Sequence, residues 1–173
     1  AASGSTASSA AASSTAASST AASAAGQTFK VGIVNYVDHA SLNQIVESVE
    51  SRLDELGKEK GVTFDYGDYY ANAQADQTNL NQIGADLVAD GVDVIVAVAT
   101  PTAATMLAAV EDTEIPVVYS AVTDPAAAGF DTEPNITGTS DALNTDAIMN
   151  LILAVNPDID TIGLLYDLSQ DAS

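Results

Sequence analysis

Four apolar, strand-like runs in this chain each end in a short patch of small hydroxyl and acidic residues. The runs are Val92–Ala99, Val117–Tyr119, Ile136–Thr137 and Ile162–Tyr166, and the patches after them are 100–102, 123–125, 139–141 and 167–169. Helix-like sequence follows each patch, so a unit of strand, polar turn and helix is repeated. Such repeats predict an α/β fold with a doubly wound parallel sheet, whose strand ends share one edge. A small ligand can bind at that edge, against backbone N–H groups and helix N-termini.

The rest of the chain continues this alternation. Further strands are expected at Lys30–Tyr36 and at Val62–Tyr66, and the last strand at Thr161–Tyr166. The expected helices have a polar start and a stop signal: Ser41 to Gly57, Asp76 to Gly91, Thr102 to Val110, and Asn144 or Thr145 to Val155. A short helical turn is expected at Pro125–Ala128.

Composition divides the chain into a tether and one folded unit. The first 26 of the 173 residues are only Ala, Ser, Thr and Gly, and such a stretch cannot bury enough surface to offset its conformational entropy. We therefore expect residues 1–28 to be a disordered tether and residues 29–166 to form one α/β lobe. The tether is interpreted as a spacer after a membrane anchor, or alternatively as a remnant of expression.

The charge of the chain excludes several kinds of partner. There are 24 acidic residues against four basic ones, a net charge of −20, and all the acidic residues lie beyond residue 26. A surface this acidic repels nucleic acid and anionic lipid, so neither is an expected partner. No apolar run approaches the roughly 20 residues of a spanning helix. The chain has no cysteine, which removes disulfides and thiolate chemistry.

Catalytic and cofactor motifs are missing at the places where this fold would carry them. The turn after the first expected strand, residues 35–41, contains no glycine, which argues against a dinucleotide. The segment Gly138–Ala142 lacks the second glycine of a nucleophile elbow. His39 is the single histidine, so a zinc site is not expected, although a cation site made of carboxylates stays open. We expect no catalytic residue, no cofactor and no metal.

Five segments, in order, carry a resemblance to a known family. They read VGIVNYVDHASLN, VDVIVAVATPTAA, IPVVYSAVTDPAAAG, NITGTSDA and IGLLYDLSQDAS. From Lys30 to Ser173 the chain resembles the ABC-transporter substrate-binding proteins that include tryptophan- and tyrosine-binding lipoproteins. The resemblance implies two periplasmic-binding-protein-like lobes that close on a ligand about a hinge. It also implies that this chain is the N-terminal lobe, and that residues 167–173 are the hinge crossing and the start of a second lobe.

The function that this resemblance implies is extracytoplasmic solute binding for an ABC importer. The expected ligand is a small amino-acid-like molecule, with an aromatic amino acid favoured, and the expected protein partner is an ABC permease. The protein would be a cell-surface lipoprotein or periplasmic, with membrane contact only through an N-terminal lipid anchor absent from this chain. A ligand-sensing domain of a signalling or regulatory protein is the alternative, and a small enzyme on a flavodoxin-like sheet is a third.

Charged and hydroxyl residues at the strand ends are the candidate ligand contacts. Thr100 and Thr102 would hold a carboxylate at a helix start, unless they serve only in N-capping. Asp141, and with less support Asp124, would pair with an ammonium, although Asp124 before a proline is better explained as a helix cap. The remaining neutral hydrogen bonds would come from Thr123 and Ser140.

Three further residues complete the predicted site. Tyr36, with His39 nearby, lies at the mouth of the first expected strand, where it would stack on a planar side chain. Simple packing of Tyr36, and an exposed loop position for His39, are the competing interpretations. Ser169 stands where the resemblance places the hinge and the start of a helix in the second lobe.

Overall fold

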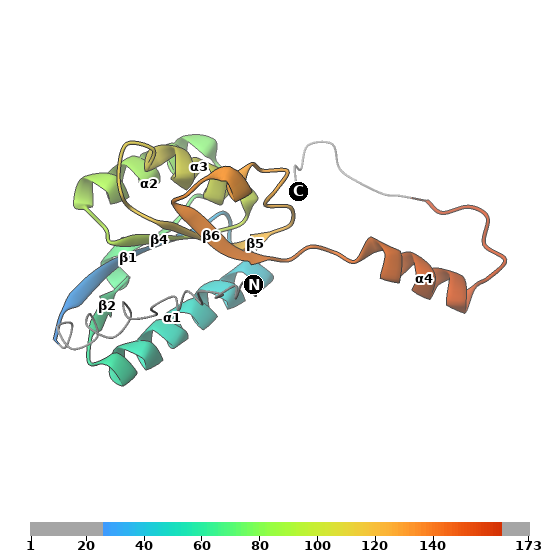
Figure 1. The fold of residues 1–173 in the computed structure, drawn as a ribbon, viewed down its shortest axis with the longest axis horizontal. Coiled ribbons are helices and arrows are strands. Elements are labelled where there is room, and N and C mark those ends of the chain that lie inside the picture. Colours follow the sequence, from blue (N-terminus) through green and yellow to red (C-terminus); the bar gives the residue numbers. More distant parts are fainter. Residues whose placement is uncertain (1–25, 164–173) are drawn as a thin grey trace, which may run out of the picture.

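A parallel sheet of six strands forms the centre of the molecule (Figure 1). The structure is a computed structural model and describes residues 26–163. The strand order is β2-β1-β4-β5-β6, with β3 also paired to β1, and every pairing is parallel. The strands are β1 (Thr28–Asn35), β2 (Thr63–Asp65), β3 (Tyr70–Asn72), β4 (Val94–Val98), β5 (Val117–Val122) and β6 (Ile136–Ser140). The doubly wound α/β sheet predicted from the sequence is confirmed.

Helices lie on both faces of this sheet (Figure 1). The α-helices are α1 (Ala40–Lys60), α2 (Gln77–Asp90), α3 (Thr100–Ala109) and α4 (Thr145–Val155), and short 3-10 turns occur at η1 (Gly67–Tyr69) and η2 (Phe130–Thr132). Helix α1 covers one face over β1 and β4, while α2 and α3 cover the other face. The predicted turn at Pro125–Ala128 is present as a hydrogen-bonded turn before η2.

Two apolar clusters, one on each face, hold these layers together. The cluster under α2 and α3 includes Leu80, Ile95, Met106 and Val117, all fully buried. The smaller cluster under α1 includes Val31, Ile33, Val46 and Val98. Successive residues of β1 and β4 alternate between the two clusters because side chains of a strand point alternately to opposite faces. The central strands are therefore buried on both sides, as their uninterrupted apolar sequence predicts.

The ends of α2 follow the sequence prediction, and those of α1 do not. Asp76 caps α2 by accepting a hydrogen bond from Asn79 N–H at 2.9 Å, and Gly91 ends it at φ 63°. Helix α1 is capped by His39 instead of Ser41. It continues past Gly57, which is buried inside the helix, to end at Gly61. A Cβ at position 57 would lie 2.9 Å from the carbonyl oxygen of Val62, so this glycine permits close packing and does not terminate the helix.

The expected ends of the strands also shift. Strand β6 extends to Ser140, so residues 139 and 140 belong to the strand and not to a turn after it. The predicted last strand is not present over residues 161–163, which have no regular structure, and residues 164–166 lie outside the described residues. Residues 1–25 of the predicted tether 1–28, and the predicted hinge segment 167–173, also lie outside them. Thr28, the last residue assigned to the tether, begins β1.

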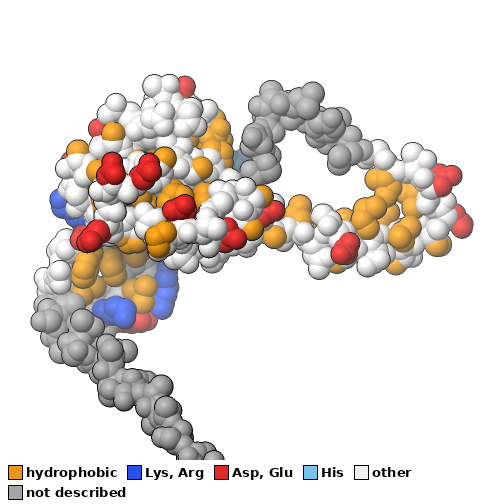
Figure 2. Space-filling model, turned by 45° about the horizontal axis from the view of Figure 1, so that its top comes forward, with side chains coloured by type: hydrophobic (Ala, Val, Ile, Leu, Met, Phe, Trp, Pro, Cys, Tyr) orange, Lys and Arg blue, Asp and Glu red, His pale blue; other side chains and the backbone are white. Residues whose placement is uncertain are grey.

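Helix α4 does not pack against the sheet as the other three α-helices of the described residues do. It extends away from the sheet, and its apolar side chains lie on its surface (Figures 1 and 2). The most exposed are Leu151 at 66% and Val155 at 79%. Its sequence forms a helix as expected, capped by Asn144, but the helix has no apolar partner in the described part of the chain. Within residues 26–163, no helix has the length and apolar character needed to cross a membrane.

Candidate functional site

Strained backbone gathers at the carboxyl edge of the sheet. Within the described residues, the non-glycine residues with positive φ are Gln74, Ala75, Ala99 and Ala121, at 57°, 55°, 82° and 55°. Gln74 and Ala75 come after β3, Ala99 comes directly after β4, and Ala121 lies near the end of β5. Side chains disfavour this backbone region, so such residues persist only where the surrounding structure holds them, often at functional sites. The strain marks the edge that the sequence pattern indicated.

Hydrogen bonds between neighbouring segments hold two of these residues in place. The N–H of Ala75 donates to the carbonyl of Tyr36 at 2.8 Å, and the N–H of Ala99 donates to the carbonyl of Ser120 at 2.9 Å. These bonds tie the ends of β3 and β4 to the strands beside them. The backbone positions of Ala75 and Ala99 are therefore held by the protein itself.

The first turn of α3 presents an uncapped helix N-terminus at this edge. Its N-cap residue is Ala99, which has no side chain that accepts a hydrogen bond. Pro101 lacks an N–H, and the first helical bond runs from Ala103 to the carbonyl of Ala99. The N–H groups of Thr100 and Thr102 therefore have no hydrogen-bond partner within residues 26–163. Such groups, with the positive end of the helix dipole behind them, favour an anion. Neither threonine hydroxyl caps the helix.

The two threonines of this turn differ in exposure. Thr100 is half-buried, whereas the side chain of Thr102 is fully buried and its Oγ1 has no hydrogen-bond partner in the described part of the chain. The Thr102 hydroxyl does not reach the surface in this conformation. A ligand at this helix start would therefore meet Thr100 first.

Thr123, Ser140 and Asp141 are brought together at the ends of β5 and β6. Thr123 Oγ1 donates to Asp141 Oδ1 at 3.1 Å, and Ser140 Oγ donates to the carbonyl of Thr123, also at 3.1 Å. The N–H of Asp141 donates to the carbonyl of Val122 at 3.2 Å. The Asp141 carboxylate is thus oriented by the protein while its residue stays exposed.

Asp124 caps a turn, as its competing interpretation predicts. Its Oδ1 accepts a hydrogen bond from Ala127 N–H at 2.9 Å, and its carbonyl accepts one from Ala128 N–H at 3.1 Å. The carboxylate therefore satisfies the backbone of residues 125–129. A role in binding an ammonium group stays an untested prediction for this residue.

Tyr36 and His39 lie close in sequence but have different surroundings. Tyr36 is half-buried and packs against the larger core cluster, which is the packing role that competes with stacking. His39 is exposed, and its Nδ1 accepts a hydrogen bond from Ser41 N–H at 3.3 Å as the cap of α1. Ligand contact stays a prediction for both. Ser169 lies outside the described residues.

Sequence reasoning missed Asn35, a buried amide at the end of β1. Its Nδ2 donates to Asn43 Oδ1 at 2.9 Å, and Asn43 in turn donates to Asp38 at 2.5 Å. Because the Asp38 carboxylate accepts only, this series of hydrogen bonds fixes the orientation of both amides. Asn35 Oδ1 is left without a partner among residues 26–163. The signal was present in the sequence, since Asn35 is the one polar residue that ends an otherwise apolar run.

The site is an open surface in this lobe. Across residues 26–163, no three or more His, Asp or Glu side chains are grouped to hold a metal ion. A groove of about 500 Å³ lies beside α1, and its lining residues include none of the candidate ligand contacts. The candidate groups instead form a row along the ends of β4, β5 and β6. A second surface would have to cover this row to enclose a small molecule.

Comparison with known proteins identifies the family. A family model described as ABC transporter substrate binding protein matches residues 30–173. The tyrosine-binding protein of Clostridioides difficile (strain R20291) is 32% identical over 145 residues, which are 81% of this chain and 41% of the relative. The chain therefore spans less than half of that protein.

Two solved structures are similar in both sequence and fold. One is an ABC domain in complex with L-Trp from Streptococcus pneumonia, at 33% identity and a TM-score of 0.69, covering 84% of this chain and 49% of that one. The other is the ligand-free, open form of a substrate-binding protein with adhesive properties from Clostridium difficile. It is 29% identical, with a TM-score of 0.62, and covers 83% of this chain and 49% of that one. The chain belongs to the ABC transporter substrate-binding protein family.

Proposed function

We propose that the full-length protein captures an amino acid for an ABC importer and that an aromatic amino acid is its ligand. Family membership supports the transport role, and two similar proteins are described with tyrosine or L-Trp as ligand. The permease is the expected partner, and the protein works outside the cytoplasm. Attachment through a lipid anchor is a further prediction from the sequence.

The observation that carries this proposal is the uncapped start of α3 beside the Thr123–Asp141 pair. The α3 N–H groups and the helix dipole suit a carboxylate, and the exposed Asp141 carboxylate suits an ammonium. Strand β5 separates β4 from β6, so the two groups lie about 10 Å apart at the usual strand spacing. An amino-acid head group and its two hydrogen bonds fill a gap of this size.

Closure by a second lobe would complete the site. The chain spans about half of its relatives. Ser140 and Asp141 are exposed and Thr100 and Thr123 are half-buried, so the row of candidate contacts is open to solvent. We place the crossing to the second lobe after Ser140, where the last strand ends and the chain leaves the sheet toward α4. This is upstream of the crossing at 167–173 expected from the sequence. Lobe closure about such a hinge would trap the ligand for the permease.

A thermal-shift screen of the full-length protein against the twenty amino acids, together with sugars, flavins and nucleotides, tests the ligand class. A ligand present at a hundred times its Kd stabilises the folded protein by about 2.7 kcal/mol, which gives a clear rise in Tm. We expect tryptophan, tyrosine or phenylalanine to give the largest rise. A rise only with sugars, flavins or nucleotides would contradict the proposal.

Two variants tie that shift to the site. Asp141→Asn keeps the shape of the side chain but removes the charge, so we expect the affinity for the amino acid to fall by roughly tenfold to a hundredfold, as for the loss of a charge-assisted hydrogen bond. Asp112→Asn is the matched control, because Asp112 is an exposed acid just past the C-terminal end of α3, away from the row of contacts. Equal loss in both variants would show that only net charge matters.

A further inference from the structure

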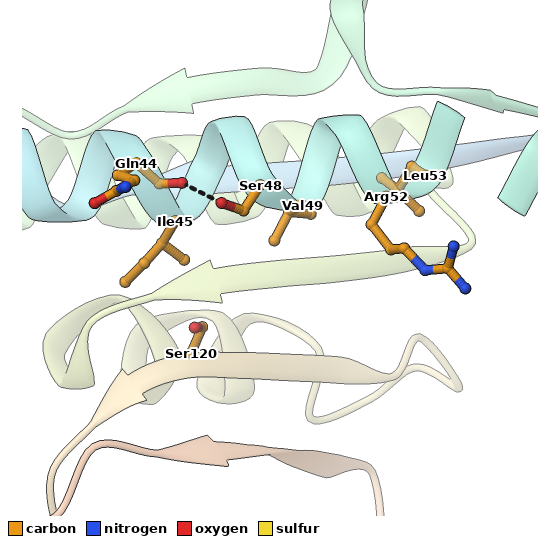
Figure 3. A pocket seen from close by; sticks show the side chains of 7 residues that line it. All are labelled: Gln44, Ile45, Ser48, Val49, Arg52, Leu53 and Ser120. Atoms are coloured by element: carbon orange, nitrogen blue, oxygen red, sulfur yellow. Dashed lines mark hydrogen bonds between the residues drawn. The ribbon is translucent and has the colours of Figure 1, made fainter. Parts of the chain in front are cut away.

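A groove of about 430 Å³ lies between the second half of α3 and the segment that leads into β6, and we call it the α3 groove. It is separate from the groove beside α1, whose lining includes Arg52 (Figure 3). The candidate ligand contacts lie at the start of α3 and the end of β6, so the α3 groove lies toward the opposite edge of the sheet. Its apolar lining comes from both sides: Ala104, Leu107 and Ala108 of α3, and Ala128, Phe130 and Pro134 of the facing segment.

Contacts within the lobe fix both sides of the α3 groove. The ring of Phe130 packs against the ring of Tyr119, with their centroids 5.6 Å apart. Thr113 Oγ1 donates to the carbonyl of Val110 at 2.9 Å and accepts from Ile115 N–H at 3.2 Å, which holds the chain just after α3. The groove is therefore formed in the unbound lobe, and a partner that fits it has less ordering to offset.

Carboxylates line the rim of this apolar groove. Glu111 lies on one side of it and Glu133 on the other, and both are exposed. Glu114 and Asp131, also exposed, each directly follow a lining residue in the sequence. The ion pairs found in residues 26–163 all involve Arg52, so neither rim glutamate has a basic partner among them. No lysine or arginine lies beyond residue 60 of the chain.

We propose that the α3 groove binds a basic, apolar peptide segment of a partner protein, in which arginine or lysine side chains alternate with aliphatic ones. Long basic side chains lay their aliphatic stems on apolar surface and keep their charged ends outside it. They therefore match a groove with Leu107 and Pro134 inside and Glu111 and Glu133 at its rim. The negative potential of the chain attracts such a segment from a distance. The inference goes beyond amino-acid capture and does not depend on it.

Segments of this chain itself fit the groove less well. A second copy carries the same net charge of −20, so two copies repel one another at ordinary salt concentration. Residues 1–26 have neither a charge nor a large apolar side chain, so they complement neither feature of the groove. Helix α4 has exposed apolar side chains, but its one charged residue is Asp146, which has the same sign as the rim.

Fluorescence anisotropy with short labelled peptides tests the proposal. One peptide alternates arginine with leucine, a second alternates arginine with serine, and a third alternates glutamate with leucine. Each is titrated with this chain and with the full-length protein. We expect the arginine–leucine peptide to bind about tenfold more tightly than the arginine–serine peptide, since burial of one aliphatic side chain accounts for such a factor. Equal affinity of these two peptides, or binding of the glutamate–leucine peptide, would overturn the proposal.

Two pairs of charge variants locate the bound peptide. Glu111→Gln combined with Glu133→Gln should weaken binding by roughly fivefold to tenfold, as expected for the loss of two exposed charge pairs. Glu47→Gln combined with Asp68→Asn is the matched control, because it removes the same charge from exposed positions of α1 and η1 outside the groove. The control should change the affinity by less than about twofold. Equal losses in both would mean that net charge alone attracts the peptide.

A variant that fills the groove separates its shape from its charge. Ala104→Phe, at an exposed position of α3, should weaken binding by about tenfold because the new ring obstructs the peptide. Ala85→Phe, exposed on α2 and outside the groove, should leave the affinity unchanged. Circular dichroism confirms that both variants are folded. Unchanged affinity in Ala104→Phe would contradict the proposed location.

Two further results would replace the proposed partner with another occupant. Peptide binding to this chain but not to the full-length protein would mean that the added half covers the groove. A mass that rises with protein concentration in sedimentation, and that Ala104→Phe restores to the monomer, would mean that a second copy occupies it. Failure of amino-acid binding would leave the peptide affinities unchanged, so this proposal and the proposed function fail separately.

Discussion

Helices α2 and α4 have the same kind of N-cap, but α2 is packed in the core and α4 is exposed. Asp76 caps α2 and Asn144 caps α4, each accepting a hydrogen bond at 2.9 Å from the N–H three residues later. Leu80 of α2 is fully buried, whereas Leu151 of α4 is 66% exposed. The same local signals thus start both helices, but only α2 has a sheet and a neighbouring helix to pack against. Local sequence decides where a helix forms, and its partners decide how much stability it contributes.

Truncation of one leucine in each helix should give the largest difference. Leu80→Ala leaves a cavity in a fully packed core, and we expect it to lower the free energy of unfolding by about 2–5 kcal/mol. Leu151→Ala removes an exposed side chain, and we expect a change within about 0.5 kcal/mol. Urea denaturation of this chain, followed by circular dichroism, measures both. A comparable loss in the two variants would mean that α4 packs on the lobe in solution.

Removal of the two caps should give a smaller difference. Asp76→Ala removes the bond to Asn79 N–H, and we expect the lobe to lose about 1 kcal/mol. Asn144→Ala removes the equivalent bond to Ala147 N–H, which should weaken α4 but leave the stability of the lobe unchanged. Urea denaturation reports on the lobe, and amide hydrogen exchange in residues 145–155 reports on α4. Loss of lobe stability in Asn144→Ala would contradict the comparison.

The smallest expected change in stability comes from a hydrogen bond between α1 and the residue that follows β2. Tyr66 Oη donates to Asp54 Oδ1 at 3.0 Å. This bond is the main cause that raises the pKa of Tyr66 above its ordinary value of 10.0, and desolvation is the second cause. A pKa raised by folding means that the stabilisation is complete below the pKa of the unfolded state. It is lost as the pH rises through the folded-state value.

Ultraviolet absorbance of ionised tyrosine checks this prediction. Tyr66→Phe should remove the component that titrates above the ordinary pKa, and Asp54→Asn should move that component down. Unfolding measurements should show a small decline in stability above pH 10 that is absent in Tyr66→Phe. A Tyr66 that titrates at its ordinary value in the intact protein would mean that the bond to Asp54 does not persist in solution.

Much of the fold follows from local patterns that the sequence displays. Uninterrupted apolar runs predicted the central strands, and helical spacing predicted the four α-helices found in residues 26–163. Asp76 and Gly91 were recognised as helix ends, and Asn144 was one of two candidates for the start of α4, because each acts on its own backbone neighbours. Gly57 was wrongly predicted to end α1, because its role does not depend on its neighbours in sequence. Its role depends on the approach of Val62, a contact that helical spacing does not reveal.

The candidate site also has features that the sequence predicted and features that only the structure shows. The sequence placed Thr100, Thr123, Ser140 and Asp141 at strand ends, and the structure places them along one edge, with the last three joined by hydrogen bonds. It gave no sign of the positive φ at Ala99 and Ala121, because alanine disfavours that conformation and only surrounding contacts hold it there.

The sequence by itself determined the α/β alternation, the family, and the kinds of side chain at the carboxyl edge of the sheet, but it did not predict β3. These properties depend on residues close together in the chain. Only the tertiary structure decided that Asn35 is buried, that Val118 of β5 is exposed, and that α4 stands apart from the sheet (Figure 1). Burial depends on which surfaces meet, and surfaces meet through contacts between residues far apart in the sequence.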